Sequence, residues 1–522
     1  MTGVCRTFLF ALFVVLAAVP VEADRPAAEP TITISAGPDT LQIGYRLKHP
    51  IRALELAPAK SGVRSGWTVV SAGIVLDGHT LRRANGSTLD DAVVTLAPDT
   101  VRIDRAYPQA LRVGLGWLVH GPYLAAAEGG GKARVRVPPD WIALPRKPLT
   151  GHFYVGPRSY LRDGIVSPPA IPDALRSTAA AALRQATLSY GRRFALAPPA
   201  PPLVVLAVDP TLERGWRGDS TAGALSLRFA EVSLHQPPQV GVIGRFVAHE
   251  VFHDWWQGVV APLTGEKGAW VEEGMAEYAA LLTSDDPAAV STDLTRRLNG
   301  CRGSLAPEGL LAAPPTGGEA VYDCGVVFQW LRDLQRRRAS GGRDDAFAGW
   351  RDLLQRHHRT GVAVEWRAAI APLPAFAADD AADLLLSPAP DRWPRLVATL
   401  NGLGARIIPA RGDPDYRVAI LKHLLSSVCR ERMGFYTQAK NVKLDTGDRC
   451  GPLNGDPVVD AIAGHALFGD AAGAFDAVAG LCASGKPVVL QEGGRAVATL
   501  ACTKPIEPPA ERWSVEAWRP PA

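Results

Sequence analysis

The residues with the clearest chemical potential are two histidines four positions apart, His249 and His253, with Glu250 directly after the first. On a helix, residues i and i+4 lie on one face about one turn apart, so both imidazoles can reach one metal ion. In an HExxH pattern the glutamate lies beside that pair, where it can act on a water molecule at the metal. The preceding residues, 242–248, are mostly apolar and contain no proline, which predicts a buried and rigid helix.

A carboxylate that can complete such a site follows in residues 270–278, WVEEGMAEY, which also read as a helix. Two histidines and one glutamate leave a fourth position open for water, which is the catalytic arrangement for zinc. Glu272 and Glu273 are both candidates, but they diverge by about 100° around a helix, so only one can face the metal. An HExxH sequence can also arise by chance, although a chance match has no reason to be followed by such a helix.

HExxH followed by a W-x-x-E-G helix resembles the gluzincin metallopeptidases, in particular the aminopeptidase N and glycyl aminopeptidase families. These families place the ligand glutamate directly before a glycine, which implies Glu273, before Gly274, as the third zinc ligand. The usual aminopeptidase N spacing selects Glu272 instead, so Glu273 requires one inserted residue in the connecting loop, for which 255–258 is a candidate. Glu277, one turn further along, can hold a ligand histidine by its second ring nitrogen or can be a solvated helix carboxylate.

Residues 320–331, AVYDCGVVFQWL, resemble the Y-x-K-G segment of the same families. The resemblance implies that Tyr322 donates a hydrogen bond to the oxyanion of the tetrahedral intermediate. Cys324 stands where lysine is usual, and a tyrosine at a helix start can also serve only in packing. The resemblance covers roughly residues 230–335. It implies one Zn²⁺ per chain and a mainly α-helical, gluzincin (thermolysin-like) catalytic domain.

The amino terminus predicts export. Residues 1–23 contain Arg6, an apolar run at 7–19 and small residues at the end, as in a secretory signal peptide. An N-terminal membrane anchor is the alternative. No later run of 18 apolar residues follows, so we expect no membrane span in the mature chain. Frequent alanine and an excess of arginine over lysine favour a GC-rich bacterial genome, and hence a periplasmic or secreted protein.

Length and composition predict several globular domains without affinity for nucleic acid. The 522 residues exceed what one hydrophobic core normally serves, and 47% hydrophobic with 21% charged residues is typical of a globular protein. A net charge of +4 without an extended basic block gives no indication of nucleic-acid binding. The sequence predicts no particular oligomeric state.

Strand and helix patterns predict three regions after the signal peptide. Residues 24–149 read as an N-terminal all-β sandwich, because short alternating segments are separated by turn signals; these segments are 31–34, 68–70, 92–96 and 134–137. Residues 150–400 read as the catalytic domain. Residues 401–522 read as a small C-terminal α+β domain. Part of this last region weakly resembles the second half of a PDZ domain, and an unrelated α+β domain is the alternative.

Cysteine usage supports an oxidising compartment. Six cysteines remain after the signal peptide, and fifteen pairings are possible. The pairing of sequence neighbours is Cys301 with Cys324, Cys429 with Cys450, and Cys482 with Cys502. The first of these bonds would tie down the segment that leads to Tyr322. Free buried thiols are the alternative, which an oxidising compartment disfavours.

Together these features predict an exported zinc peptidase that acts on peptides or unfolded proteins, with aminopeptidase-like action. Residues 223–229 are expected to form the edge strand that binds substrate backbone in the resembling families. In aminopeptidase N that strand carries a glutamate for the substrate amine, but here Ser226 occupies the position and Glu231 lies five residues further on. An endopeptidase of the same fold and a non-catalytic binding scaffold therefore remain as alternatives.

Overall fold

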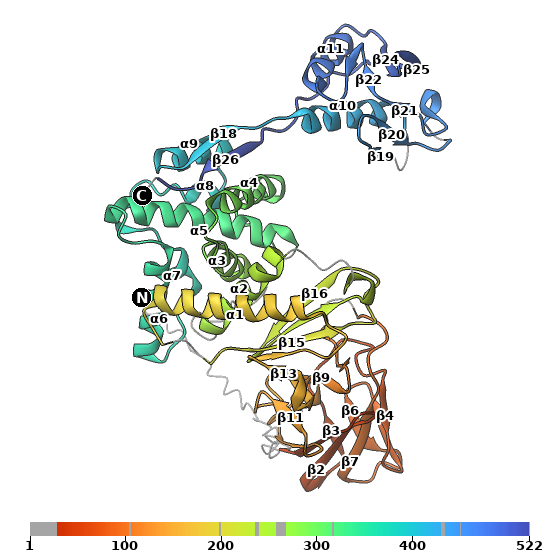
Figure 1. The fold of residues 1–522 in the computed structure, drawn as a ribbon, viewed down its shortest axis with the longest axis vertical. Helices are drawn as coiled ribbons and strands as arrows, with labels where there is room; N and C mark the ends of the chain where they lie inside the picture. Colours follow the sequence, from red (N-terminus) through yellow and green to blue (C-terminus); the bar gives the residue numbers. More distant parts are fainter. Residues whose placement is uncertain are drawn as a thin grey trace, which may run out of the picture. The chain divides into compact units, whose positions relative to one another are not determined.

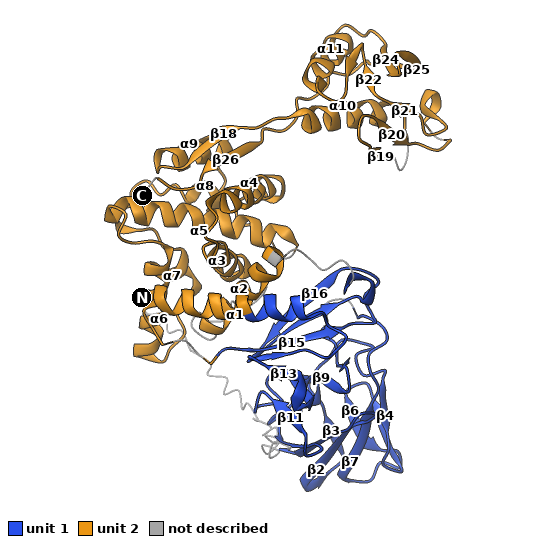
Figure 2. Ribbon diagram, viewed as in Figure 1, with its two compact units in different colours: residues 1–180, 201–240 blue, residues 181–200, 241–522 orange. Residues whose placement is uncertain are grey.

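The computed structural model describes residues 29–103, 106–197, 200–234, 240–256, 268–315, 318–429, 434–448 and 450–520. The predicted signal peptide lies outside these residues, as does the segment 257–267 between the two motif helices. The chain divides into two compact units, residues 1–180 with 201–240 and residues 181–200 with 241–522 (Figure 2). The predicted domain boundaries at 149 and 400 stay predictions.

The first unit contains an all-β sandwich, as the alternating segments predicted (Figure 1). One sheet has the order β10-β1-β2-β7-β4, formed by Lys132–Arg136, Thr31–Ala36, Leu41–Ile51, Leu89–Leu96 and Trp67–Val69. A second has the order β11-β12-β9-β8, formed by Trp141–Leu144, His152–Pro157, Gly116–His120 and Ala110–Val113. A small third sheet joins β3 (Ala53–Glu55), β6 (Thr80–Arg83) and β5 (Ile74–Asp77).

The sandwich is stabilised by one apolar core. Alternate residues of β1 and β2, such as Ile34 and Ile43, pack with Trp117 of β9 and Phe153 of β12. This is the inward and outward alternation that a sheet with one buried face requires. The four segments predicted from alternation all belong to the first sheet, where β2 joins them as the longest strand.

A further sheet of this unit corrects one expectation. Its order is β13-β14-β15-β17-β16, formed by Leu161–Arg162, Ile165–Val166, Leu203–Val208, Ala224–Phe229 and Trp216–Thr221. Strand β17 pairs with β15 on one side and β16 on the other, so the prediction that residues 223–229 form the edge strand is wrong. A tight turn at Gly223, with a φ of 75°, folds β16 back along β17 and makes β16 the edge.

The second unit begins with a set of helices. Helix α1 (Asp173–Phe194) has residues in both units and is followed by the three strands β15, β16 and β17 before the motif helices begin. The others are α2 (Val240–Trp256), α3 (Ala269–Leu281), α4 (Pro287–Ser304), α5 (Glu319–Ser340), α6 (Ala346–Thr360), α7 (Trp366–Ile370), α8 (Asp383–Leu386) and α9 (Arg392–Gly402). The predicted motif helices correspond to α2, α3 and α5.

A smaller module with its own core follows α9. It contains two helices, α10 (Asp413–Val428) and α11 (Ala471–Ala483). Its strands are β19 (Gly434–Thr437), β20 (Val442–Asp445), β21 (Val458–Val459), β22 (Ala461–Ile462), β23 (His465–Ala466), β24 (Val488–Glu492) and β25 (Arg495–Leu500). Leu421 of α10, Val478 of α11 and Leu490 of β24 share the core. The module is therefore α+β, and its PDZ identity stays a prediction.

The chain enters and leaves this module through paired strands. Strand β18 (Arg406–Pro409) precedes it, strand β26 (Trp513–Ala517) follows it, and the two are antiparallel. The backbone carbonyl of Trp518 accepts a hydrogen bond from the Trp330 indole at 2.8 Å, which fixes the end of the chain to α5.

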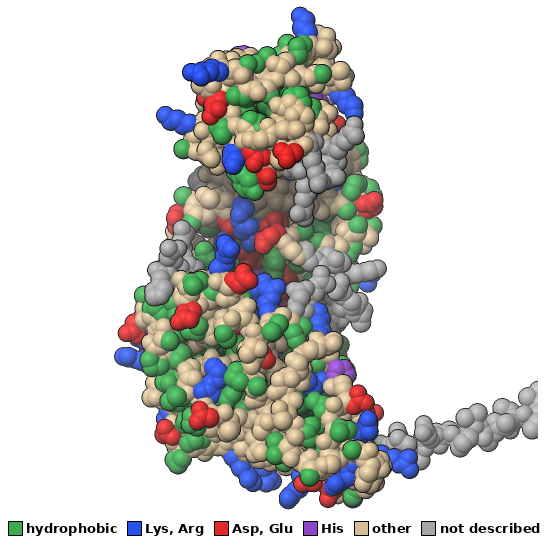
Figure 3. All heavy atoms as spheres, turned by 90° about the vertical axis from the view of Figure 1, so that its right-hand side faces the viewer, with side chains coloured by type: hydrophobic (Ala, Val, Ile, Leu, Met, Phe, Trp, Pro, Cys, Tyr) green, Lys and Arg blue, Asp and Glu red, His purple; other side chains and the backbone are tan. Residues whose placement is uncertain are grey.

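Among the residues that the structure describes, no helix is both long enough and apolar enough to cross a bilayer. On the face drawn in Figure 3, basic and acidic side chains are interspersed rather than gathered by sign.

Candidate active site

Helix α2 carries the HExxH residues and is held firmly by aromatic packing. Phe252 is fully buried and lies against Tyr190, Trp256 and Trp350 at ring-centroid distances of 5.8, 5.7 and 5.3 Å. The Tyr190 hydroxyl donates to the backbone carbonyl of Ala248 at 2.9 Å. These contacts fix both the position and the rotation of the helix, and therefore the direction in which its histidines point.

The structure brings the predicted ligand atoms together. The Nε2 atoms of His249 and His253 are 3.1 Å apart, and Oε2 of Glu273 lies 3.0 Å from the first and 3.6 Å from the second. Glu272 instead points its carboxylate at Nδ1 of His253, 3.6 Å away, and is 44% exposed. The geometry therefore places Glu273, and not Glu272, where the two Nε2 atoms converge.

This donor set fits a zinc ion. Nδ1 of His249 is 2.9 Å from the Glu277 carboxylate, so in the neutral ring it donates there and leaves a lone pair on Nε2. Two imidazole nitrogens and a carboxylate oxygen that face one another repel unless positive charge lies between them. Tetrahedral zinc with bonds of about 2.0–2.1 Å separates its ligand atoms by about 3.3 Å, close to the distances between these three atoms.

The charge around the histidines favours a cation. Burial acts to lower the pKa of His249, but hydrogen bonds with Glu273 and Glu277 outweigh it and raise the pKa to about 9. The pKa of His253 is likewise raised against burial by Glu272 and Glu273. Burial acts to raise the pKa of Glu273, yet the two histidines hold that pKa well below its usual range. The carboxylates around His249 and His253 therefore stabilise positive charge at this site, either as protons or as a metal ion.

Glu277 is held in a buried network that the sequence did not reveal. Its carboxylate accepts from Arg297 of α4 and lies 3.8 Å from Arg245 of α2. Burial acts to raise the pKa of Glu277, but the His249 hydrogen bond and Arg297 bring it to about 2. The glutamate is therefore ionised, only 7% exposed and fixed against His249, which favours the orienting role over the solvated one.

Two glycines bring Tyr322 near these residues. A side chain at Gly274 of α3 would place its Cβ 2.4 Å from the Gly325 Cα of α5, so only glycines allow the two helices to approach this closely. Each glycine belongs to a motif, Gly274 directly after Glu273 and Gly325 three residues after Tyr322. The Tyr322 and His249 rings have their centroids 6.0 Å apart. The close crossing thus explains why both motifs contain a glycine.

The Tyr322 hydroxyl is kept as a proton donor. Burial raises its pKa, and the charges of Glu273 and Glu250 raise it further. The disulfide Cys301–Cys324 joins α4 to the first turns of α5 beside Tyr322, with an S–S distance of 2.06 Å. Arg297 also donates to Asp323 at 2.9 Å. The residues around Tyr322 are therefore fixed to the same helix, α4, that supports Glu277.

The three disulfides pair sequence neighbours. Besides Cys301–Cys324, the structure contains Cys429–Cys450 and Cys482–Cys502. The pairing of sequence neighbours is thus confirmed, and the alternative of free buried thiols is wrong for all six cysteines.

The sequence matches no protein-family model and no curated protein. The fold is similar to that of an aminopeptidase N family protein from Idiomarina loihiensis, with a TM-score of 0.58, 14% identity, and coverage of 94% of this chain and 100% of that chain. An M1 zinc metallopeptidase from Deinococcus radiodurans has a TM-score of 0.36, 15% identity, and coverage of 72% and 93%. Native yeast LTA4 hydrolase has a TM-score of 0.40, 10% identity, and coverage of 76% and 72%. The first likeness shows that this chain shares its fold with that protein; the other two, at these scores, carry no argument.

Proposed function

We propose that the protein is an exported zinc-dependent peptidase that hydrolyses peptide bonds with aminopeptidase-like action. The observation that carries the proposal is the convergence of Nε2 of His249, Nε2 of His253 and Oε2 of Glu273 within 3.0–3.6 Å of one another. The aminopeptidase N-like fold supports the same conclusion. A binding scaffold without activity would need neither this donor set nor Glu250 beside it.

In the proposed reaction each side chain has a role that depends on its protonation state. One zinc ion per chain, bound to His249, His253 and Glu273, would lower the pKa of a water molecule and polarise the scissile carbonyl. Glu250 takes a proton from the attacking water and passes it to the leaving amine. Tyr322, kept protonated by burial and by its acidic neighbours, donates to the oxyanion.

The proposed export rests on two independent features. Residues 1–23 read as a signal peptide, and all six remaining cysteines form disulfides. Such bonds form and persist in oxidising compartments. A periplasmic or secreted bacterial enzyme fits both features.

The proposed exopeptidase action rests on the family resemblance. Ser226 is fully buried on the internal strand β17, so the lack of a glutamate at this position is no evidence against exopeptidase action. Glu231 follows that same strand and gives no better candidate.

The mechanism is tested by Glu250→Gln, because this change removes the proposed base and leaves all three proposed ligands. We expect about one zinc per chain to be retained and peptide hydrolysis to fall by about 10²–10⁴-fold. Glu308→Gln, at an exposed glutamate with no part in the site, is the matched control and should leave both unchanged. Full activity in Glu250→Gln would exclude this mechanism, and an inactive wild-type protein with bound zinc would favour the scaffold alternative.

Two peptides of the same sequence, one with a free amino terminus and one acetylated, test whether the enzyme removes the first residue or cuts internal bonds. We expect mass spectrometry to detect release of the first residue from the free peptide only. Equal cleavage of both peptides at internal bonds would identify an endopeptidase.

A further inference from the structure

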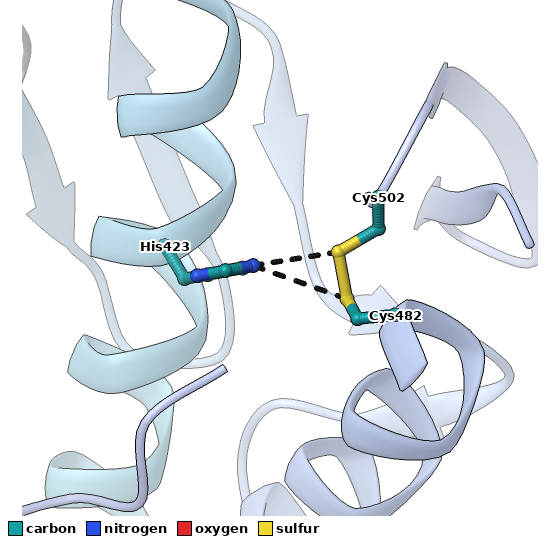
Figure 4. A group of neighbouring side chains, drawn as sticks. All are labelled: His423, Cys482 and Cys502. Atoms are coloured by element: carbon teal, nitrogen blue, oxygen red, sulfur yellow. Dashed lines mark hydrogen bonds between the residues drawn. A yellow bond between two sulfur atoms is a disulfide. The ribbon is translucent and has the colours of Figure 1, made fainter. Parts of the chain in front are cut away.

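A second set of metal-ligand side chains lies in the C-terminal α+β module. His423 on α10 faces the Cys482–Cys502 disulfide, with Nε2 3.4 Å from Sγ of Cys502 and 3.9 Å from Sγ of Cys482 (Figure 4). Both cysteines are buried, at 3% and 1% exposure, whereas His423 is half-buried. One nitrogen and two sulfurs therefore converge at the boundary between core and solvent.

This arrangement distinguishes the Cys482–Cys502 bond from the other two disulfides. Among the residues that the structure describes, only two groups place three potential ligand atoms within 4.8 Å of one another, and they are this group and the proposed zinc site. Neither Cys301–Cys324 nor Cys429–Cys450 belongs to such a group. The same chain thus provides two disulfides for comparison that lack a converging histidine.

We propose that Cys482, Cys502 and His423 form a redox-gated metal site, closed as a disulfide and able to bind Zn²⁺ when reduced. A dithiol reductant transfers two electrons and two protons to the bond, so that the reductant becomes a disulfide and Cys482 and Cys502 become thiols. Zn²⁺ then displaces the two thiol protons to water and binds the two thiolates and Nε2 of His423.

The donor types and their place in the fold favour a metal over a lasting free thiolate. Thiolate and imidazole are the ligands that zinc prefers. Cys482 lies in the last turn of α11, where the helix dipole places partial negative charge, which disfavours an unpaired thiolate and favours a cation. The half-buried His423 leaves the fourth coordination position open to water.

The site also has a structural consequence. In the oxidised protein the bond links the end of α11 to the segment after β25, while α10 has no covalent link there and reaches the two sulfurs through Nε2 of His423. The metal would restore that link in the reduced protein and would extend it to α10 through His423. The module would thus keep its cross-link in a reducing environment.

The test uses the full-length protein with Co²⁺ as the probe, because thiolate–Co²⁺ bonds produce a charge-transfer absorption band that nitrogen and oxygen ligands do not. The proposed peptidase site contains no thiolate, so it cannot produce the band. We expect no band in the oxidised protein, and after reduction by a dithiol and its removal without air, a band that saturates at one Co²⁺ per chain and is bleached by Zn²⁺. The result is independent of peptidase activity.

Variants assign the band to this site. His423→Ala should weaken Co²⁺ binding at least about tenfold, since it removes one of three ligands. His465→Ala is the matched control, because His465 lies in the same module but pairs with Asp470 at 2.8 Å. Cys482→Ser with Cys502→Ser should abolish the band even if His423→Ala folds poorly. A fully reduced protein without the band, or a band unchanged in His423→Ala or in the double serine variant, would overturn the proposal.

Discussion

The chain contains two close pairs of histidines with nearly the same ring geometry, one pair in each compact unit. The rings of His249 and His253 have centroids 4.9 Å apart and planes inclined by 72°. For His120 and His152 the values are 4.8 Å and 72°. The first pair lies one turn apart on α2, and the second lies directly opposite on the neighbouring strands β9 and β12.

The surroundings of the two pairs shift the histidine pKa values in opposite directions. His249 and His253 face carboxylates, which raise the pKa of each against the effect of burial. Tyr107 stacks on His120, whose pKa burial lowers to about 4. Burial also lowers the pKa of His152, and neither ring nitrogen of His152 has a hydrogen-bond partner among the described residues.

We infer from this difference that proximity of two imidazoles alone does not make a metal site. The third donor and the local negative charge decide whether the pair attracts a cation or remains neutral and serves in packing. Four predictions test this contrast, from the largest expected effect to the smallest.

Replacement of one histidine in each pair should have unequal consequences. We expect His249→Ala to lower zinc affinity by more than about 100-fold and to abolish hydrolysis, because it removes a proposed ligand from the acidic pair. His152→Phe should keep zinc and activity, since an apolar ring of similar shape replaces an imidazole without hydrogen bonds. The measurement is metal content after dialysis together with peptide hydrolysis. Zinc loss in His152→Phe would break the contrast.

The third donor can be examined directly by comparing two adjacent glutamates. Glu273→Ala should release zinc, because its carboxylate lies 3.0 Å from Nε2 of His249. Glu272→Ala should retain zinc, because this half-exposed side chain meets only the Nδ1 side of His253. Isothermal titration of the metal-free proteins with zinc measures both. The reverse result would transfer the ligand role to Glu272.

The contribution of local charge is tested by Glu277→Gln, which keeps a hydrogen-bond acceptor for His249 but removes the negative charge. We expect zinc affinity to fall by about 10–100-fold, the usual cost of losing an outer partner of a ligand histidine. Asp470→Asn, which makes the same change beside the exposed His465, is the control and should leave the affinity unchanged. An unaltered affinity in Glu277→Gln would show that charge at this position is unimportant.

The neutral pair predicts a pH dependence of stability in the first unit. The unfolded state binds a proton on His120 near pH 6.5 and the folded state only near pH 4, so the unfolded chain binds more protons between these values. The stability contributed by a neutral His120 is therefore complete above about pH 6.5 and falls as the pH drops towards 4. The loss is at most about 3 kcal/mol, and His120→Phe should remove it.

This effect is measured by hydrogen exchange of β9 and β12 in wild type and variant at matched pH. Asp99 acts in the opposite direction, because burial raises its pKa to about 6 and its protonation favours the folded state as the pH falls. The difference between the two proteins, rather than either curve alone, therefore reports on His120. Identical pH dependence in both would contradict the prediction.

The amino-acid sequence by itself determined the features that depend on local geometry. Spacing of four residues on a helix is sufficient to bring His249 and His253 together, and alternation is sufficient to identify the buried faces of strands. The disulfides also follow sequence neighbours. The α+β class of the C-terminal region follows from its sequence, but the position of helix α10 does not.

The tertiary structure decided everything that depends on the meeting of separate elements. The rotation of α3 against α2 brings the carboxylate of Glu273, rather than that of Glu272, to Nε2 of His249, and helix α4 supplies Arg297 to fix Glu277. The turn at Gly223 makes β16 rather than β17 the edge strand. The pair His120 and His152, and the approach of His423 to a disulfide, join residues 32, 59 and 79 positions apart in the chain. Periodicity carries no information about such contacts, because they are set by how helices and strands pack and not by the order of residues within any one of them.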